Sequence, residues 1–261
     1  MAMIDRGMVR KLSLFAKMRD DELDKLISYA TLRRILQGES VFGQGDEAVS
    51  FYLLVHGRLK VNQVTPDGQQ IIVRMVHPGD LFGFARALQR KDYPGTATAL
   101  TESIVFGWPT ELWDYFVEQN PGLAMNAIQT IGQRLEEAHT RIREMSTEEV
   151  ERRVAHVVLR LAHKAGKKDE SGIRIDFPIT RQDIAEMTGT TLHTVSRILS
   201  SWEAKGMVLG GRQKLTVIDS RGIKSLPRGS LIRYFGSLPF IFNLSQRSRF
   251  HERLSCAGRY R

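Results

Sequence analysis

Two different hydrophobic patterns follow one another along the chain. Between residues 38 and 108, short apolar stretches rich in β-branched and aromatic residues alternate with turns that contain glycine. Short strands separated by such turns are typical of a small antiparallel sandwich or barrel. The predicted strands cover residues 40–42, 51–55, 59–64, 69–76, 96–100 and 104–106. An amphipathic helix with acidic residues in its first turn is predicted just before them, from Asp20 onward.

After Trp108 the spacing of apolar residues becomes helical. One helix is predicted around 109–116 and a longer one along 121–145. In the longer helix, apolar residues recur at alternating spacings of four and three, as in a coiled coil. They are Ala124, Ile128, Ile131, Leu135, Ala138, Ile142 and Met145. This narrow stripe favours a dimer seam, and the alternative is a helix that packs on its own β unit.

The segment from Ser146 to Glu149 predicts a break between two helices. A short hydroxyl side chain followed by acidic residues is typical of a helix N-cap. The next helix is apolar at Val150, Val154, Val157, Val158 and Leu161, and it ends in the polar run 166–172. We therefore expect a domain boundary near residue 146.

Residues 179–206 have the pattern of a helix-turn-helix. A short helix is predicted at about 180–188 and a longer one to about 205, with a turn at Gly189 and Thr190 between them. Ala185 is small where two helices cross, Gly189 can adopt the left-handed conformation, and Val195 faces back into the core. Residues 207–218 predict a hairpin, or wing, with two glycines near its tip. The alternative is a helical pair with no nucleic-acid partner.

At this point the chain resembles the CRP/FNR family of bacterial transcription regulators. The resemblance covers residues 10–226 and rests on the order of the parts and on three motifs: PGDLFG at 78–83, TRQDIA at 180–185 and TVSRIL at 194–199. It implies an α+β fold, in which a β-roll like a cyclic-nucleotide-binding domain, with N-terminal helices, occupies 1–108. A helical segment with the dimerisation helix would cover 109–146, a winged helix-turn-helix 147–226, and a tail 227–261.

The resemblance also implies a partner and a mode of action. The protein would be a homodimer that binds an inverted repeat in double-stranded DNA, with RNA polymerase as a further partner. The implied base contacts are His193, Ser196 and Arg197, and His193 stands where many relatives carry glutamate. The implied backbone contacts are Thr180, Arg181, Gln182, Thr191, Thr194, Arg212 and Lys214.

The position of the effector site follows from the same resemblance. Phe84 stands where nucleotide-binding relatives carry glutamate, and Gly95, before Thr96, stands where they carry arginine. Without that arginine a phosphate lacks a charge-assisted partner, so cyclic AMP is disfavoured. The candidates for the effector pocket are Gly83, Phe84, Gly95 and Thr96, and Arg86 or Arg90 could substitute for the missing arginine. A cyclic-nucleotide-responsive or ligand-independent regulator remains the alternative.

The number and position of cysteines and histidines limit which cofactors the chain could bind. Cys256 is the single cysteine, so an iron–sulfur cluster, an internal disulfide and a zinc finger are excluded. The altered nucleotide site and His193 look most like the nitric-oxide-responsive denitrification regulators of the family, which are thought to use haem. His139, beside the predicted seam, is a weak candidate for an iron ligand, and no metal site is predicted.

Composition and charge add little to this hypothesis. The net charge is +9, but residues 227–261 supply +6 of it through seven arginines and one glutamate, so charge is weak support for DNA binding.

Residues 226–230 resemble a protease site of expression vectors, and we expect the tail to be disordered or vector-derived. No apolar run could span a membrane, which favours the cytoplasm. A cupin-type enzyme is disfavoured, because its metal site needs several inward histidines and this region offers only His56 and His77.

Overall fold

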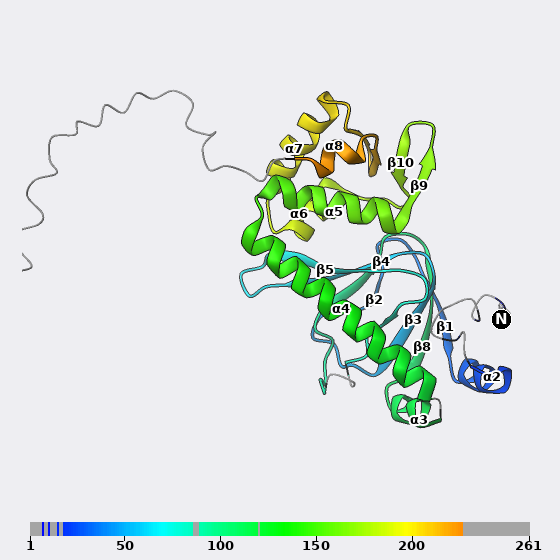
Figure 1. The fold of residues 1–261 in the computed structure, drawn as a ribbon. Coiled ribbons are helices and arrows are strands. Elements are labelled where there is room, and N and C mark those ends of the chain that lie inside the picture. Colours follow the sequence, from blue (N-terminus) through cyan, green and yellow to red (C-terminus); the bar gives the residue numbers. More distant parts are fainter. Residues whose placement is uncertain are drawn as a thin grey trace, which may run out of the picture. The chain divides into compact units, whose positions relative to one another are not determined.

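The computed structural model describes residues 18–85, 89–119 and 121–226, together with Gly7, Arg10 and Phe15. Arg86, Cys256 and the predicted tail at 227–261 lie outside these residues. Figure 1 shows the elements in chain order. They are α2 (Asp20–Ser28), β1 (Thr31–Ile35), β2 (Ser40–Phe42), β3 (Ser50–His56), β4 (Leu59–Val64), β5 (Gln70–Val76), β6 (Leu81–Phe82), β7 (Thr96–Ala99), β8 (Ser103–Pro109), α3 (Leu112–Gln119), α4 (Pro121–Thr147), α5 (Val150–Ala165), β9 (Gly166–Asp169), β10 (Gly172–Ile175), α6 (Arg181–Thr188), α7 (Leu192–Ala204), β11 (Val208–Gly211), β12 (Lys214–Val217) and α8 (Ser220–Lys224).

The N-terminal part is a β-roll, which confirms the predicted all-β unit. Two antiparallel four-stranded sheets have the orders β1-β8-β3-β6 and β2-β7-β4-β5. One apolar cluster, which includes Leu54, Leu59 and Val76, fills the roll, and a second cluster joins the first sheet to helices α2 and α3. In the second cluster, Trp108 donates its indole N–H to the carbonyl of Leu26 at 2.9 Å, which ties α2 to the sheet. Strands β1 and β6 were not among the predicted strands.

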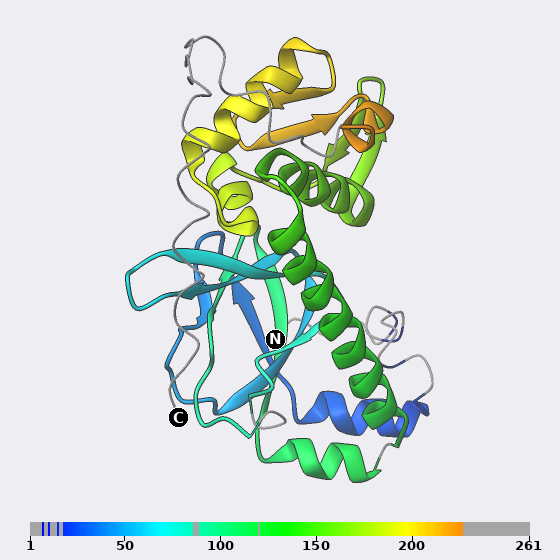
Figure 2. The same cartoon turned by 60° about the vertical axis from the view of Figure 1, so that its left-hand side comes forward.

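Helix α4 runs along the β-roll, as Figures 1 and 2 show. Polar contacts hold it there. Arg134 lies 3.4 Å from a carboxylate oxygen of Asp80, and Arg141 donates to the carbonyl of Val73 at 3.3 Å. Ala127 faces the protein and is 7% exposed. The predicted apolar stripe faces the other way, with Ile128 62% exposed, so it does not pack on the β unit of its own chain.

The junction of α4 and α5 differs from the predicted capping. Helix α5 begins at Val150 after Glu149, and Glu149 makes no side-chain capping bond. The hydroxyls of Ser146 and Thr147 donate instead to the carbonyls of Ile142 and Arg143, each at 2.8 Å. The predicted N-cap is therefore wrong, because α4 continues to Thr147 and both hydroxyls bond back to carbonyls one turn earlier in the same helix.

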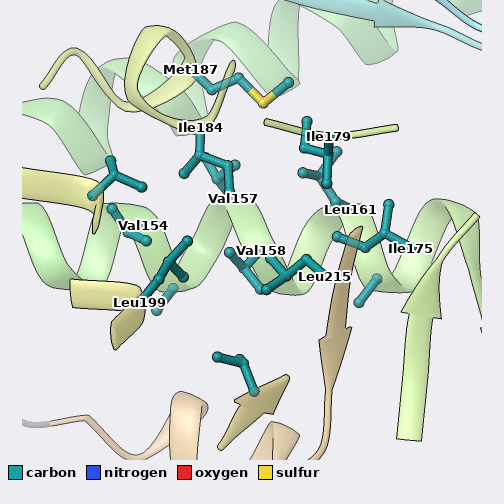
Figure 3. Close-up of a cluster of buried hydrophobic side chains, with 14 of the residues drawn as sticks. Val154, Val157, Val158, Leu161, Ile175, Ile179, Ile184, Met187, Leu199 and Leu215 are labelled. Atoms are coloured by element: carbon teal, nitrogen blue, oxygen red, sulfur yellow. The ribbon is translucent and has the colours of Figure 1, made fainter. Parts of the chain in front are cut away.

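The C-terminal part confirms the winged helix-turn-helix. Its sheet has the order β11-β12-β10-β9, and one apolar cluster joins α5, α6, α7 and the wing (Figure 3). Gly189 ends α6 in the left-handed conformation with φ +62°. The polar run 166–172, which the sequence indicated only as a helix end, forms the hairpin β9–β10. None of the helices among the described residues is long and apolar enough to cross a membrane.

Candidate nucleic-acid interface

Side-chain caps position both helices of the helix-turn-helix. Thr180 accepts from the amide of Asp183 at 3.0 Å, and the Asp183 carboxylate accepts from the amide of Thr180 at 2.9 Å. This reciprocal capping box satisfies amides at the start of α6. Thr191 accepts from the amide of Thr194 at 3.2 Å and begins α7 in the same way. The threonine that precedes each helix therefore sets where that helix begins.

Helix α7 has one buried and one exposed side. Val195, Leu199 and Trp202 are at most 2% exposed and pack against the rest of the domain. His193 and Arg197 are exposed, and their spacing of four places them on one helix face. Of the three predicted base contacts, only Ser196 is half-buried.

Several predicted backbone contacts, distant in sequence, line one cavity. The cavity has a volume of about 370 Å³ and lies between the start of α6, the start of α7 and the wing. Thr180, Arg181, Gln182 and Lys214 are among its lining residues. Arg212 is exposed in the wing turn, and Thr191 and Thr194 lie at the start of α7. The fold thus brings the predicted backbone contacts of α6 close to Lys214 of the wing.

The polar side chains around this cavity form ion pairs and hydrogen bonds with other residues of the protein. Arg181 pairs with Glu203 at 3.2 Å, and Gln182 donates to Glu186 at 2.9 Å. The Thr180 hydroxyl also donates to the Asp183 carboxylate, at 2.6 Å. A phosphate that approaches Arg181 would therefore compete with the Glu203 carboxylate.

Three residues at this surface were missed by the sequence reasoning. Leu192 is 47% exposed at the start of α7 and lines the cavity. Ser200 is exposed three residues after Arg197, and Glu203 contacts Arg181. The helical period could have placed Ser200 on the face of Arg197, whereas a leucine in a helix is normally expected in the core.

The four candidates for the effector pocket have different surroundings. Gly83 has φ +72°, and a Cβ there would lie 3.0 Å from the rings of Phe42 and Tyr52. A Cβ on Gly95 would lie 2.8 Å from the backbone oxygen of Asn62. Phe84 packs against the apolar cluster that joins the first sheet to α2 and α3, and its ring stacks on that of Trp113. Thr96 accepts from the amide of Gln44 at 2.9 Å, and Arg90 pairs with Asp92.

Stacked aromatic rings fill the inside of the β-roll next to Gly83. The rings of Phe42 and Tyr93 are 3.8 Å apart between centroids, and Tyr52 and Phe82 stack at 5.4 Å. Burial raises the pKa of Tyr93, whose hydroxyl donates to the carbonyl of Ser50 at 2.6 Å. The hydroxyl is therefore a neutral, satisfied part of the core.

The inside of the β-roll does not fit a haem. His139 is exposed on α4 and lines neither the cavity against α5 nor the cavity at the start of α6. Within the described ranges, no group of three or more histidine, cysteine, aspartate or glutamate side chains could hold a metal ion. A haem pocket needs an enclosed apolar space beside its iron ligand, and the aromatic rings occupy the inside of the roll.

Asp80 is the main electrostatic centre between the β-roll and α4. Its carboxylate lies 3.3 Å from Arg74, 3.4 Å from Arg134 and 3.7 Å from His77. Burial would raise the pKa of Asp80, but hydrogen bonds from His77 and the two guanidinium groups outweigh it and hold that pKa well below its ordinary value. Asp80 therefore stays ionised and anchors α4.

Both parts of the chain match known families. A model of the cyclic nucleotide-binding domain matches residues 32–120, and a model of the Crp-like helix-turn-helix domain matches residues 152–226. The transcriptional regulator LdrP of Thermus thermophilus is 30% identical over 193 residues, which cover 72% of this chain and 92% of LdrP.

Solved structures agree with this assignment. A CRP-family transcriptional regulator from Thermus thermophilus is 27% identical with a TM-score of 0.64, over 74% of this chain and 94% of that one. FixK2 from Bradyrhizobium japonicum is 21% identical and shares the fold, with a TM-score of 0.66 over 77% of this chain and 98% of FixK2. With a β-roll, a long helix and a Crp-like helix-turn-helix, the chain belongs to the CRP/FNR family of DNA-binding transcription regulators.

Proposed function

We propose that the protein binds an inverted-repeat DNA site as a homodimer, with one α7 helix in the major groove of each half-site. The observation that carries this proposal is the division of α7 into a buried apolar side and an exposed side with His193 and Arg197. The major groove admits a single α-helix, and a two-fold dimer presents two such helices to successive grooves.

The exposed face of α7 supplies chemistry for reading bases. Arg197 can donate two parallel hydrogen bonds to a guanine, and His193 and Ser196 can each add a contact to a base edge. The exposed side chain of Leu192 suits the methyl group of a thymine. Because His193 replaces a glutamate, the preferred half-site differs from that of glutamate-bearing relatives.

Backbone contacts would surround the cavity at the start of α6. Arg181 would exchange Glu203 for a DNA phosphate, since a guanidinium makes charge-assisted hydrogen bonds with either group. Gln182, Lys214 and Arg212 lie at the same surface or in the wing turn. The N-cap residues Thr180 and Thr191, together with Thr194 in the first turn of α7, complete the set, with hydroxyls beside the first-turn amides of α6 and α7.

The homodimer would form along α4. Its apolar stripe is uncovered in the single chain: Ile128 and Ile142 are each 62% exposed, and Leu135 is 56% exposed. A second α4 helix on this stripe would bury these side chains in the spacing of a coiled coil. The dimer bound at a promoter would then act on RNA polymerase, a partner that rests on the family resemblance.

The effector of the β-roll is a separate part of the proposed function. Control by nitric oxide through haem rests on resemblance alone, because apolar and aromatic side chains fill the inside of the β-roll. Control by a cyclic nucleotide lacks the family's arginine, because Gly95 stands at that position and a Cβ there would lie 2.8 Å from the backbone oxygen of Asn62. We therefore favour the ligand-independent alternative for the β-roll as it is folded here.

The test is selection of bound sequences from a random DNA pool, followed by affinity measurements on the selected site. Arg197→Ala should lower the affinity for the selected site by about tenfold to a hundredfold, and leave binding to unrelated DNA unchanged. Arg174→Ala, which removes another exposed arginine of the same domain, is the matched control and should bind like the parent. Equal affinities of parent and Arg197→Ala, or selected sites without two-fold symmetry, would contradict the proposal.

A further inference from the structure

A buried ion pair joins the β-roll to the first helix of the helix-turn-helix. Lys60 of β4 places its Nζ 2.7 Å from Oδ1 of Asp183 in α6. The side chains of Lys60 and Asp183 are only 21% and 6% exposed. A pair that is shielded from water to this degree is screened little by salt, unlike the surface pairs of the molecule.

Asp183 also completes the capping box at the start of α6. Its Oδ2 accepts the amide of Thr180 at 2.9 Å and the Thr180 hydroxyl at 2.6 Å, while Oδ1 accepts from Lys60. One carboxylate thus connects a strand of the β-roll with the start of α6, where Arg181 and Gln182 line the proposed DNA cavity.

The charge of Asp183 depends on these donors. Burial would raise the pKa of Asp183, but the hydrogen bonds from Lys60 and from Thr180 outweigh it and hold that pKa below its ordinary value. If Lys60 were removed, a buried carboxylate would keep only the donors of Thr180, at the position that begins the helix.

Neighbouring contacts hold the rest of α6 against the same surface. Ile72 of β5 is 1% exposed and belongs to the apolar cluster of the DNA-binding domain. Arg58 lies 5.3 Å over the ring of Phe177, and Arg141 of α4 donates to the carbonyl of Met187 near the end of α6. The Lys60–Asp183 pair is therefore the charged contact at the start of a helix that is held at both ends.

This arrangement leaves the recognition surface uncovered within the chain. His193, Arg197 and Gln182 are all exposed while Lys60 and Asp183 are paired. The pair thus accompanies a form of the domain whose DNA-facing side chains are accessible. We infer that Lys60 is a positioning residue for DNA binding: through Asp183 it fixes the start of α6, and with it the backbone contacts Thr180, Arg181 and Gln182. This inference rests on the proposed DNA-binding function and deepens it.

The first test replaces Lys60 in the full-length chain. Lys60→Met keeps a long side chain but removes the charge, and it should weaken binding to operator and unrelated DNA alike by about tenfold, within the range of typical couplings between sites. Lys60→Arg keeps the charge and should recover most of the affinity. Lys164→Met is the matched control: it removes the same charge from a more exposed pair with Glu137 and should bind like the parent.

A double-mutant cycle tests whether Lys60 acts through Asp183. In an Asp183→Asn background, Lys60→Met should have little further effect, because the two residues act through one contact. Equal losses in Lys60→Met and Lys164→Met would indicate a net-charge effect and overturn the inference. Unchanged DNA affinity in Lys60→Met, or tighter binding, would overturn it as well.

Hydrogen exchange separates this inference from the proposed function. The amides at the start of α6, including that of Asp183, should exchange about tenfold faster in Lys60→Met than in the parent or in Lys164→Met. This readout needs no DNA, so it retains its meaning if the parent selects no operator. Unchanged exchange at these amides would show that Lys60 does not fix the start of α6.

Discussion

The exposed stripe of α4 allows an estimate of how much one side chain contributes to the proposed dimer. Fully burying an isoleucine side chain contributes about 2 kcal/mol. Ile128 is 62% exposed in the single chain, so covering it would contribute about 1 kcal/mol. A two-fold axis repeats the contact, so Ile128→Ser should cost the dimer about 2 to 3 kcal/mol, or roughly a thirtyfold to hundredfold weaker dimer.

Sedimentation velocity over a concentration series measures this change directly, as the dissociation constant of the dimer. The matched control is Gln133→Ser, which introduces the same residue at an exposed position of α4 outside the stripe and should leave the constant unchanged. Serine has a helix propensity close to that of isoleucine and below that of glutamine, so a weaker dimer in Ile128→Ser than in Gln133→Ser cannot come from helix propensity. If Ile128→Ser and Gln133→Ser dimerise equally well, or if the parent is monomeric throughout, the assignment of the stripe as a dimer interface is wrong.

Two further predictions concern the β-roll. Asp80 is ionised in the folded chain with a pKa below its ordinary value of 3.8, so its contribution to the free energy of unfolding should be complete above that value and lost as the pH falls below it. Asp80→Asn should therefore be less stable than the parent to urea at about pH 6, with a difference that narrows by about pH 3; a constant difference would contradict this. Gly95→Arg, which restores the family's arginine, should lower the unfolding free energy by about 1 to 3 kcal/mol in thermal unfolding, because a Cβ would lie 2.8 Å from a backbone oxygen. An unchanged melting temperature would mean that the neighbouring strand can move away.

Much of the DNA-binding part could be predicted from the sequence because its signals are local. The spacing of Ala185, Gly189 and Val195 reflects one helix crossing another at a tight turn, and the turn needs the left-handed conformation found at Gly189. The turn glycines of the β-roll and the heptad spacing of α4 are local in the same sense. Such patterns determine the type of element and the side that is apolar.

Local patterns do not determine which distant residues meet, and here the tertiary structure decided. Only the folded chain turns the α4 stripe away from its own β-roll and points the Ser146 hydroxyl back at α4. It also packs Gly95 against the backbone of β4, where the motif comparison had suggested an open effector site. The contact between Lys60 and Asp183 spans 123 residues of sequence, and no periodicity encodes it. Such a pair depends on how strands and helices pack, because only packing brings the two charges together and removes the water between them.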